Sequence, residues 1–195
     1  MIMARSILAL VATLLVVAAC GRPSYYLLPP PSGAARLPSP VATISVADIS
    51  LPSYAAASEI ALLSDDGSVD LNNRTVWADD PVRAMTRHLV AALEGRLTAR
   101  VGAEPWPGLD PPGLRVEVFV DRLIGSAETG IEMTGQFVIV TPSSGRLYAS
   151  ERFALRTPPQ GDGVQGLMSS QARILDLLAD EIAARIAGRR PSPTA

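Results

Sequence analysis

The sequence predicts an α+β fold, a mostly antiparallel sheet of about five strands with two long helices packed on one face. Two stretches, from Pro81 to about Gly102 and from Leu167 to Gly188, carry apolar residues at helical spacing. Between them, apolar and polar residues alternate in three stretches whose links are short enough for antiparallel pairing. Because each of these elements has one apolar face, the helices and the sheet must cover one another in layers. No internal repeat is visible, so we expect a single domain.

The chain begins with the features of a secretory signal peptide, which we assign to residues 1–19. Arg5 precedes an uncharged apolar stretch that ends at Ala19. As a helix this stretch rises about 20 Å, which is too little for a hydrocarbon core of roughly 30 Å. The only cysteine, Cys20, follows Ala18 and Ala19 as in a bacterial lipobox, so cleavage would leave Cys20 as an N-terminus that carries acyl chains such as palmitate. The alternative is a soluble exported protein whose signal ends near a buried cysteine.

Residues 20–40 are expected to form the lipidated N-terminus and a Pro-rich tether. Six of the 17 prolines fall within residues 21–40, and such a stretch favours extended polyproline-type structure. At about 3.1 Å per residue it would lift the domain some tens of ångströms off a membrane. Tyr25–Leu28 is too apolar for a free linker and is expected to dock as a short edge strand. The domain would span residues 41–188, followed by a disordered tail at 189–195.

Short strands open the domain. Residues 41–49 alternate, which predicts a strand with Ile44 and Val46 inward that ends before Pro52. The next elements are a strand at Glu59–Leu63, a hairpin turn at Asp65-Asp66-Gly67 and a returning strand at Val69-Asp70-Leu71.

The first helix has a clear start. Asp80 is suited to cap the free amides, and Pro81 suits the first helical position. Gly102 is the expected end. The apolar face would carry Val82, Met85, Leu89, Leu93 and Leu97.

A three-stranded meander and the second helix complete the domain. The strands alternate around Val116, Val118 and Val120, then Ile131, Met133, Phe137 and Ile139, then Leu147, Ala149, Phe153 and Leu155. After a loop at residues 157–163, the second helix presents Leu167, Ile174, Leu178, Ile182 and Ile186 on one face.

Composition excludes several classes of protein. All 17 basic residues are arginines, and only Arg5 leaves with the signal, so the mature chain carries 16 arginines against 19 acidic residues, a formal charge of −3. A weakly acidic chain without a basic cluster is a poor nucleic-acid binder. With Cys20 assigned to lipid, no disulfide can form within the chain.

The inventory of reactive residues predicts a protein that is not an enzyme. His88 is the only histidine, and its position at the edge of the first helix's apolar face indicates a boundary residue. No Gly-x-Ser-x-Gly elbow occurs, and a zinc site would need carboxylates alone around His88. We therefore expect no catalytic residue, no cofactor and no metal site.

Four aromatic residues are candidates for partner binding. Trp77 and Trp106 are the only tryptophans, and both lie in the connections that flank the first helix. Each either plugs one end of the core or serves as an interface anchor. Tyr25 and Tyr26 present the same choice, and an edge strand there could add to a partner's sheet.

Taken together, these features resemble the ABC-type transport auxiliary lipoprotein family, the PqiC-like proteins of Gram-negative envelopes. The similarity spans most of residues 20–187. The matching stretches are the lipobox with Tyr25-Tyr26-Leu27-Leu28-Pro29, then Leu51-Pro52-Ser53-Tyr54 ahead of the Glu59–Leu63 strand, then Trp77-Ala78-Asp79-Asp80-Pro81, and Pro105-Trp106-Pro107. The chain departs from the family pattern in having two acids at Asp79-Asp80 and no Arg in the Glu59–Leu63 strand.

The resemblance implies a non-catalytic lipoprotein on the periplasmic face of the outer membrane, where Gly21 after the cysteine agrees with outer-membrane sorting. It implies an MCE-domain substrate-binding protein and an ABC permease complex as partners in lipid transport between the two membranes, and it leaves a homo-oligomer open. Two alternatives remain: a general envelope-assembly or structural lipoprotein without a transporter, and a periplasmic hydrolase that uses His88.

Overall fold

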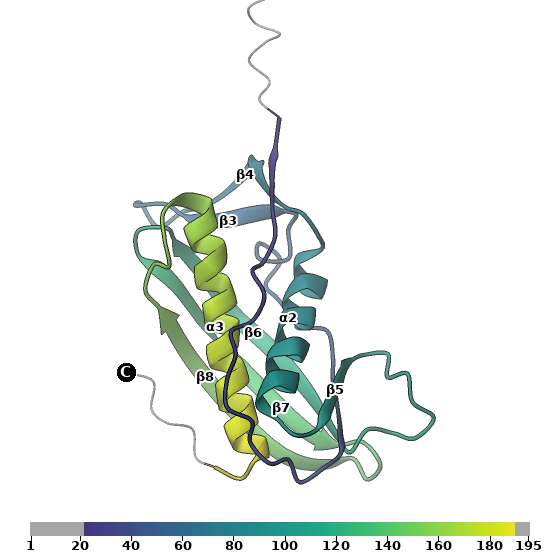
Figure 1. Cartoon of the computed structure of the whole chain (residues 1–195). Helices are drawn as coiled ribbons and strands as arrows, with labels where there is room; N and C mark the ends of the chain where they lie inside the picture. The colour runs from purple at the N-terminus through teal and green to yellow at the C-terminus, as the bar shows by residue number, and fades with distance from the viewer. Residues whose placement is uncertain (1–21, 190–195) are drawn as a thin grey trace, which may run out of the picture.

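The computed structural model describes residues 22–189, in which two helices cover one face of a five-stranded sheet and a second, three-stranded sheet lies at one end (Figure 1). The predicted α+β fold is confirmed. The signal segment, Cys20 and residues 190–195 lie outside the described residues, so these assignments stay predictions. Neither helix in the described part of the chain is long and apolar enough to cross a membrane.

The larger sheet is mixed, which corrects the expectation of a mostly antiparallel one. Its order is β5-β2-β6-β7-β8. The strands are β5 (Arg100–Ala103), β2 (Thr43–Val46), β6 (Leu114–Ser126), β7 (Gly130–Thr141) and β8 (Arg146–Thr157). The last three form the predicted antiparallel meander, whereas β2 pairs in parallel with both β5 and β6. Long connections separate β2 from both partners in the chain, so each can return in the same direction.

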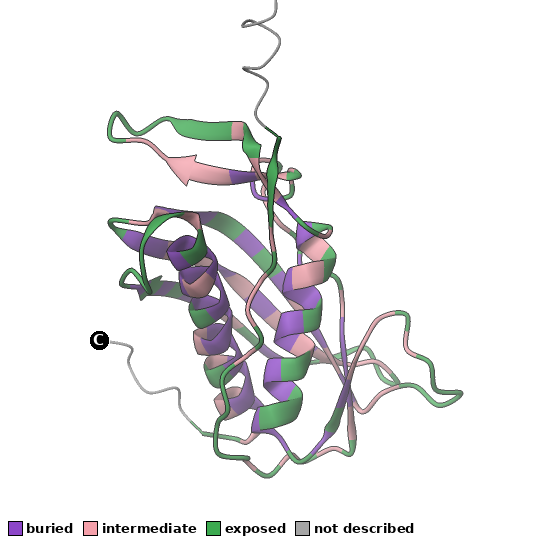
Figure 2. Cartoon of the chain, turned by 45° about the horizontal axis from the view of Figure 1, so that its top comes forward, coloured by how far each residue is buried: buried purple, intermediate pink, exposed green. Residues whose placement is uncertain are grey.

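The helices α2 (Pro81–Arg96) and α3 (Gly163–Ile186) pack against the inner face of this sheet, and the core lies between the two layers (Figure 2). The predicted inward residues of β7 and of both helices are buried, among them Phe137, Leu89 and Ile182, except that Val82 in the first turn of α2 is half-buried. Leu147 is an exception. It was predicted inward with Ala149 but is 62% exposed, because a register shift opposite Val140 breaks the alternation at the start of β8.

Helix α2 begins as predicted but ends early. The side chain of Asp80 accepts a hydrogen bond from the amide of Arg83, and Pro81 opens the helix. The helix stops at Arg96 instead of Gly102, and the next residues form β5. The cause is tertiary, since the backbone from Arg100 onward pairs with β2.

The smaller sheet has the order β1-β4-β3, with β1 (Ser24–Tyr26), β4 (Val69–Trp77) and β3 (Glu59–Leu63). The predicted edge strand and hairpin turn are therefore present, and Gly67 supplies the positive φ of 83° in the turn. β1 lies parallel to β4 and is an edge strand. The sheet lies at the end of the molecule where the chain enters the described structure (Figures 1 and 2).

Residues 27–39, hereafter the N-terminal segment, run in extended form over α2 and α3 (Figure 1). The amide of Leu37 donates to the carbonyl of Arg96 at the end of α2, and the amide of Thr98 donates to Leu37 in return. The segment thus satisfies a carbonyl that a helix end leaves free. These residues were predicted to be a tether. The structure instead packs them onto the domain.

Candidate functional site

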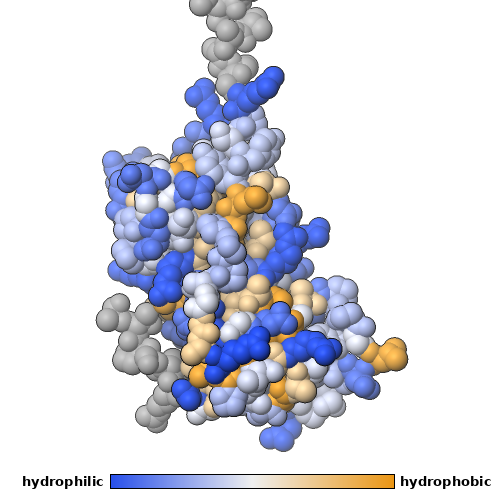
Figure 3. All heavy atoms as spheres, viewed as in Figure 1, coloured by the Kyte–Doolittle hydropathy of each residue, from blue (hydrophilic) through white to orange (hydrophobic). Residues whose placement is uncertain are grey.

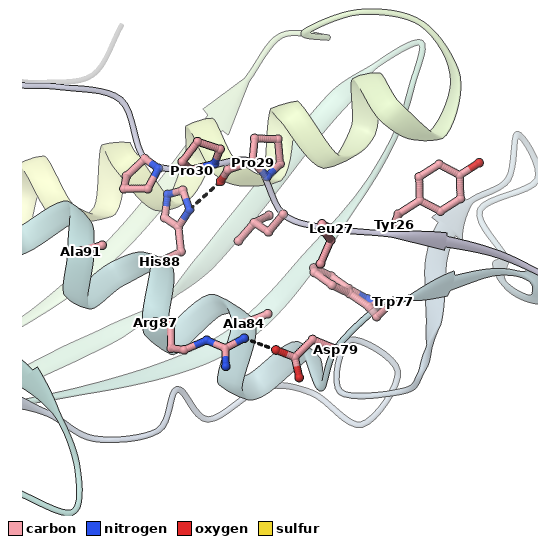
Figure 4. A pocket seen from close by; sticks show the side chains of 12 residues that line it. Tyr26, Leu27, Pro29, Pro30, Trp77, Asp79, Ala84, Arg87, His88 and Ala91 are labelled. Carbon is pink, nitrogen blue, oxygen red and sulfur yellow. Dashed lines mark hydrogen bonds and ion pairs between the residues drawn. The ribbon is translucent and has the colours of Figure 1, made fainter.

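A groove of about 230 Å³ lies between α2 and the chain from Tyr26 to Pro31 (Figure 4). It exists because α2 presents the small side chains Ala84 and Ala91 where the proline run passes. Its lining is mostly apolar, with polar groups at its edges: Tyr26, Leu27, Leu28, Pro29, Pro30, Pro31, Trp77, Asp79, Ala84, Arg87, His88 and Ala91. Hydrophobic and strongly hydrophilic residues lie next to one another on this face of the molecule (Figure 3).

The structure brings two of the four predicted aromatic residues to this groove. Tyr26 and Trp77 are register partners in β1 and β4, and both line the groove. Trp77 is 7% exposed and closes the end of the core, while Leu27 lies beside it and is 68% exposed (Figure 4). Trp77 therefore belongs to the core and also forms a wall of the groove.

An ion pair lies at the rim of the groove. Arg87 donates to the carboxylate of Asp79, and the backbone amide of Asp80 also donates to Asp79. The hydrogen bond from Arg87 is the main reason that the pKa of Asp79 lies below its ordinary value. The two adjacent acids thus have separate structural tasks, since Asp80 caps the helix and Asp79 binds Arg87.

Behind the groove, a buried carboxylate from α3 binds the N-terminal segment. One oxygen of Asp176 accepts hydrogen bonds from the amide and the hydroxyl of Ser32, at 3.0 and 2.6 Å. The other oxygen lies 3.3 Å from Nε2 of His88 and 3.6 Å from a guanidinium nitrogen of Arg96. The Asp176 side chain is only 4% exposed, so these contacts are made away from bulk water.

His88 is buried in this cluster, which corrects its prediction as a boundary residue. The N-terminal segment covers it, and Nδ1 lies 3.1 Å from the carbonyl oxygen of Pro29. Both ring nitrogens therefore face oxygen acceptors, whereas a neutral imidazole can donate only one hydrogen bond. Burial lowers the pKa of His88 below its ordinary value of 6.5, and the opposing influence of Asp176 does not fully offset it.

Arg96 completes the cluster from the last turn of α2. Its Nε donates to Asp180 at 2.6 Å, and its Nη1 donates to the carbonyl oxygens of Ala92 and Ser32 at 3.1 and 3.4 Å. Because the Arg96 side chain is only 3% exposed, these partners compensate for the loss of water around the guanidinium. The cluster joins α2, α3 and the N-terminal segment.

Trp106 lies in a different place, in the connection between β5 and β6. Its ring packs over Gly102, where an added Cβ would come within 3.1 Å of the ring. Beside it, Arg115 binds Glu104 at 2.6 Å, and Ser45 donates to the same carboxylate. The hydrogen bond from Arg115 is the main cause that lowers the pKa of Glu104. The predicted aromatic candidates therefore do not form one site.

Tyr25 is 68% exposed on β1 and does not line the groove. Cys20 lies outside the described residues. Within residues 22–189, no group of three or more His, Cys, Asp or Glu side chains could hold a metal ion.

Sequence reasoning missed Asp176, Arg96 and Ser32. A signal was present for the two charged residues, because each falls on the buried face of an amphipathic helix. A charged residue on such a face is rarely buried without a partner. That signal could have indicated a buried ion pair, although nothing in the sequence indicates Ser32 as the group it binds.

Two solved structures illustrate the fold, and a third is a more distant match. The crystal structure of an uncharacterized protein matches with a TM-score of 0.70 and 22% identity, covering 85% of this chain and 99% of that chain. Protein XCC0632 from Xanthomonas campestris matches with a TM-score of 0.62 and 17% identity, covering 85% and 96%. A PelC dodecamer from Paraburkholderia phytofirmans reaches a TM-score of only 0.44 at 11% identity, covering 83% of this chain and 95% of that chain.

No curated protein matches this sequence significantly. The sequence profile of the family described as "ABC-type transport auxiliary lipoprotein component" matches residues 25–183. This range contains the groove and both sheets and helices, except for the first residue of β1 and the last three of α3. The match covers most of the chain and includes the N-terminal segment that binds the helix pair. The chain belongs to the ABC-type transport auxiliary lipoprotein component family.

Proposed function

We propose that this protein is a non-catalytic docking lipoprotein of an ABC/MCE-type system that moves lipid between two membranes. Acyl chains on Cys20 anchor it at the periplasmic face of the outer membrane, and its domain binds the MCE-domain substrate-binding component. Membership of a transport auxiliary lipoprotein family supports the association with an ABC transport system.

The observation that carries the docking role is the groove beside an open strand edge. β1 is the edge strand of its sheet, and the chain continues from it in extended form past Leu27. An extended segment of a partner can pair with such an edge while its apolar side chains enter the adjacent groove. Leu27 and the wall formed by Trp77 and Tyr26 supply the apolar contact, and the Arg87–Asp79 pair at the rim gives the site a polar boundary.

Co-purification of the acylated protein after crosslinking tests this role. We expect an MCE-domain protein to be recovered with the wild type and its recovery to fall strongly with Leu27→Ser. Leu147→Ser is the matched control, because Leu147 is 62% exposed on another strand against 68% for Leu27. Equal recovery of the MCE-domain protein with the two variants would show that the groove beside Leu27 is not part of the docking surface.

The anchor has its own test. Cys20→Ala should release the protein from the membrane fraction and increase the sensitivity of the envelope to detergent. Repeated crosslinking that recovers no MCE-domain protein, together with neighbouring genes that encode no permease or ATPase, would instead favour a general envelope-assembly or structural lipoprotein.

A further inference from the structure

The small sheet exposes apolar side chains at the end of the molecule where the chain enters. Tyr25 on β1 is 68% exposed, and Val69 and Leu71 on β4 are 42% and 44% exposed. The hairpin of β3 and β4 and the start of β1 lie together at this end (Figures 1 and 2). Exposed apolar residues grouped on one end of a monomer indicate a contact surface, and tyrosine is a residue type enriched at membrane interfaces.

The chain between Cys20 and this sheet is short. β1 begins at Ser24, only four residues after Cys20. Four residues span at most about 14 Å when fully extended. The chain after β1 cannot lengthen this connection while β1 pairs with β4 and Ser32 is bound to Asp176. An acylated Cys20 would therefore keep the small sheet close to the bilayer.

We propose that the three-stranded sheet lies on the surface of the bilayer that holds Cys20, with Tyr25, Val69 and Leu71 in contact with the lipid headgroup region. This inference rests on the proposed lipid anchor. The headgroup region is about 5–8 Å thick on each side, so it takes up about half of the available 14 Å or so. The start of β1 therefore lies within about 9 Å of the headgroup surface.

The charges on this end favour apolar contact over attraction to anionic lipid. Arg22 and Arg74 are exposed there, but so are Asp65, Asp66 and Asp70. A hydrogen bond with Ser68 lowers the pKa of Asp66, which is therefore ionised at neutral pH. Two cations against three anions provide no net attraction to anionic headgroups, so the contact should form equally on zwitterionic lipid.

Single engineered cysteines can test this geometry, since acylation blocks the thiol of the only native cysteine. The full acylated protein would carry an environment-sensitive fluorophore at Val69→Cys or Leu71→Cys, with Leu109→Cys as the control. Leu109 is fully exposed in the connection between β5 and β6, away from the small sheet (Figure 1). The probe membrane is a phosphatidylethanolamine vesicle with nitroxide-labelled headgroups, with and without phosphatidylglycerol.

We expect blue-shifted emission and several-fold stronger quenching at positions 69 and 71 than at position 109, unchanged by phosphatidylglycerol. Protein that floats with the vesicles but is quenched equally at all three positions would overturn the proposed orientation alone. Protein that does not float would overturn the anchor, and this inference with it. Labels at two positions protect the test against a single substitution that perturbs the hairpin.

Discussion

Removing the carboxylate of Asp176 should release the N-terminal segment from the helix pair while the core stays folded. Asp176 joins three elements, since it accepts two hydrogen bonds from Ser32 and faces His88 and Arg96. In Asp176→Ala, the amide and the hydroxyl of Ser32 lose their acceptor, and the buried guanidinium of Arg96 keeps only Asp180 as an ionic partner. The two helices still share the apolar core, which does not depend on this contact.

The expected magnitude follows from the burial of the pair. Removing one partner of a buried ion pair costs about 3–5 kcal/mol. Because Arg96 retains Asp180, we take the lower end of that range, about 3 kcal/mol. If this loss falls on the docking of the segment, it raises the population of the released state roughly a hundredfold, at about 1.4 kcal/mol per factor of ten.

Amide hydrogen exchange of Leu37 measures this release. The amide of Leu37 donates to the backbone carbonyl of Arg96 at 2.7 Å. Asp176→Ala leaves this carbonyl in place, so faster exchange of the Leu37 amide would report release of the segment. We expect its exchange to accelerate by about a hundredfold in Asp176→Ala, while the amide of Phe137 in the central strand β7 is little affected. Equal acceleration at both amides would mean that the whole domain is destabilised.

Asp180→Ala is the matched control, one helical turn further along α3. Asp180 is 49% exposed and binds Arg96 but not Ser32. A partly exposed ion pair contributes at most about 1 kcal/mol, so exchange at Leu37 should rise only a few-fold. An unchanged Leu37 amide in Asp176→Ala, or equal effects of the two substitutions, would refute the assignment of Asp176 as the group that binds the segment.

The remaining predictions concern His88, the start of α2 and Trp106. Because burial lowers the pKa of His88 below 6.5, the unfolded chain binds this proton more readily, and the free energy of unfolding should fall as the pH decreases below about 6.5. Urea titrations at several pH values should find this loss reduced in His88→Gln; an identical pH dependence would contradict it. Asp80→Ala removes the 2.8 Å hydrogen bond that Asp80 accepts from the amide of Arg83, so it should lower the free energy of unfolding by about 1 kcal/mol. Thermal denaturation measures this loss, and an unchanged thermal midpoint would disprove it. Gly102→Val should displace the ring of Trp106 and increase quenching of tryptophan fluorescence by a soluble quencher, and unchanged quenching would contradict this.

Elements whose signal is local could be predicted from the sequence. The cap at Asp80, the alternation of the three meander strands and the apolar face of α3 all depend on residues within one turn or one strand, and the structure confirms them apart from Leu147. The early end of α2 is different. Val101 continues the helical spacing of Leu93 and Leu97, so periodicity alone extends the helix into residues that instead pair with β2.

The candidate site was only partly predictable for the same reason. Trp77 is a candidate because it lies in the connection before the first helix, and Tyr26 because it lies in the predicted edge strand; the pairing of β1 with β4 brings the two together. The buried cluster depends on contacts such as Ser32 with Asp176, which are 144 residues apart in the chain. Composition predicted an extended Pro-rich segment correctly, but it could not indicate that polar groups of two helices bind that segment.

The docked segment and the paired strand β1 together determine how far the domain can lie from its proposed anchor. With both in place, β1 begins four positions after Cys20, a reach of about 14 Å. If both contacts were released, about 20 residues of extended Pro-rich chain would give a reach of about 60 Å. Release of both the segment and β1 would therefore let the domain extend away from the bilayer, whereas release of the segment alone would not. Asp176→Ala frees the segment but leaves β1 paired with β4, so the label at position 71 should keep its quenching by headgroup nitroxides while the protein still floats. Lost quenching together with rapid exchange at Leu37 would mean that the pairing of β1 with β4 depends on the docked segment.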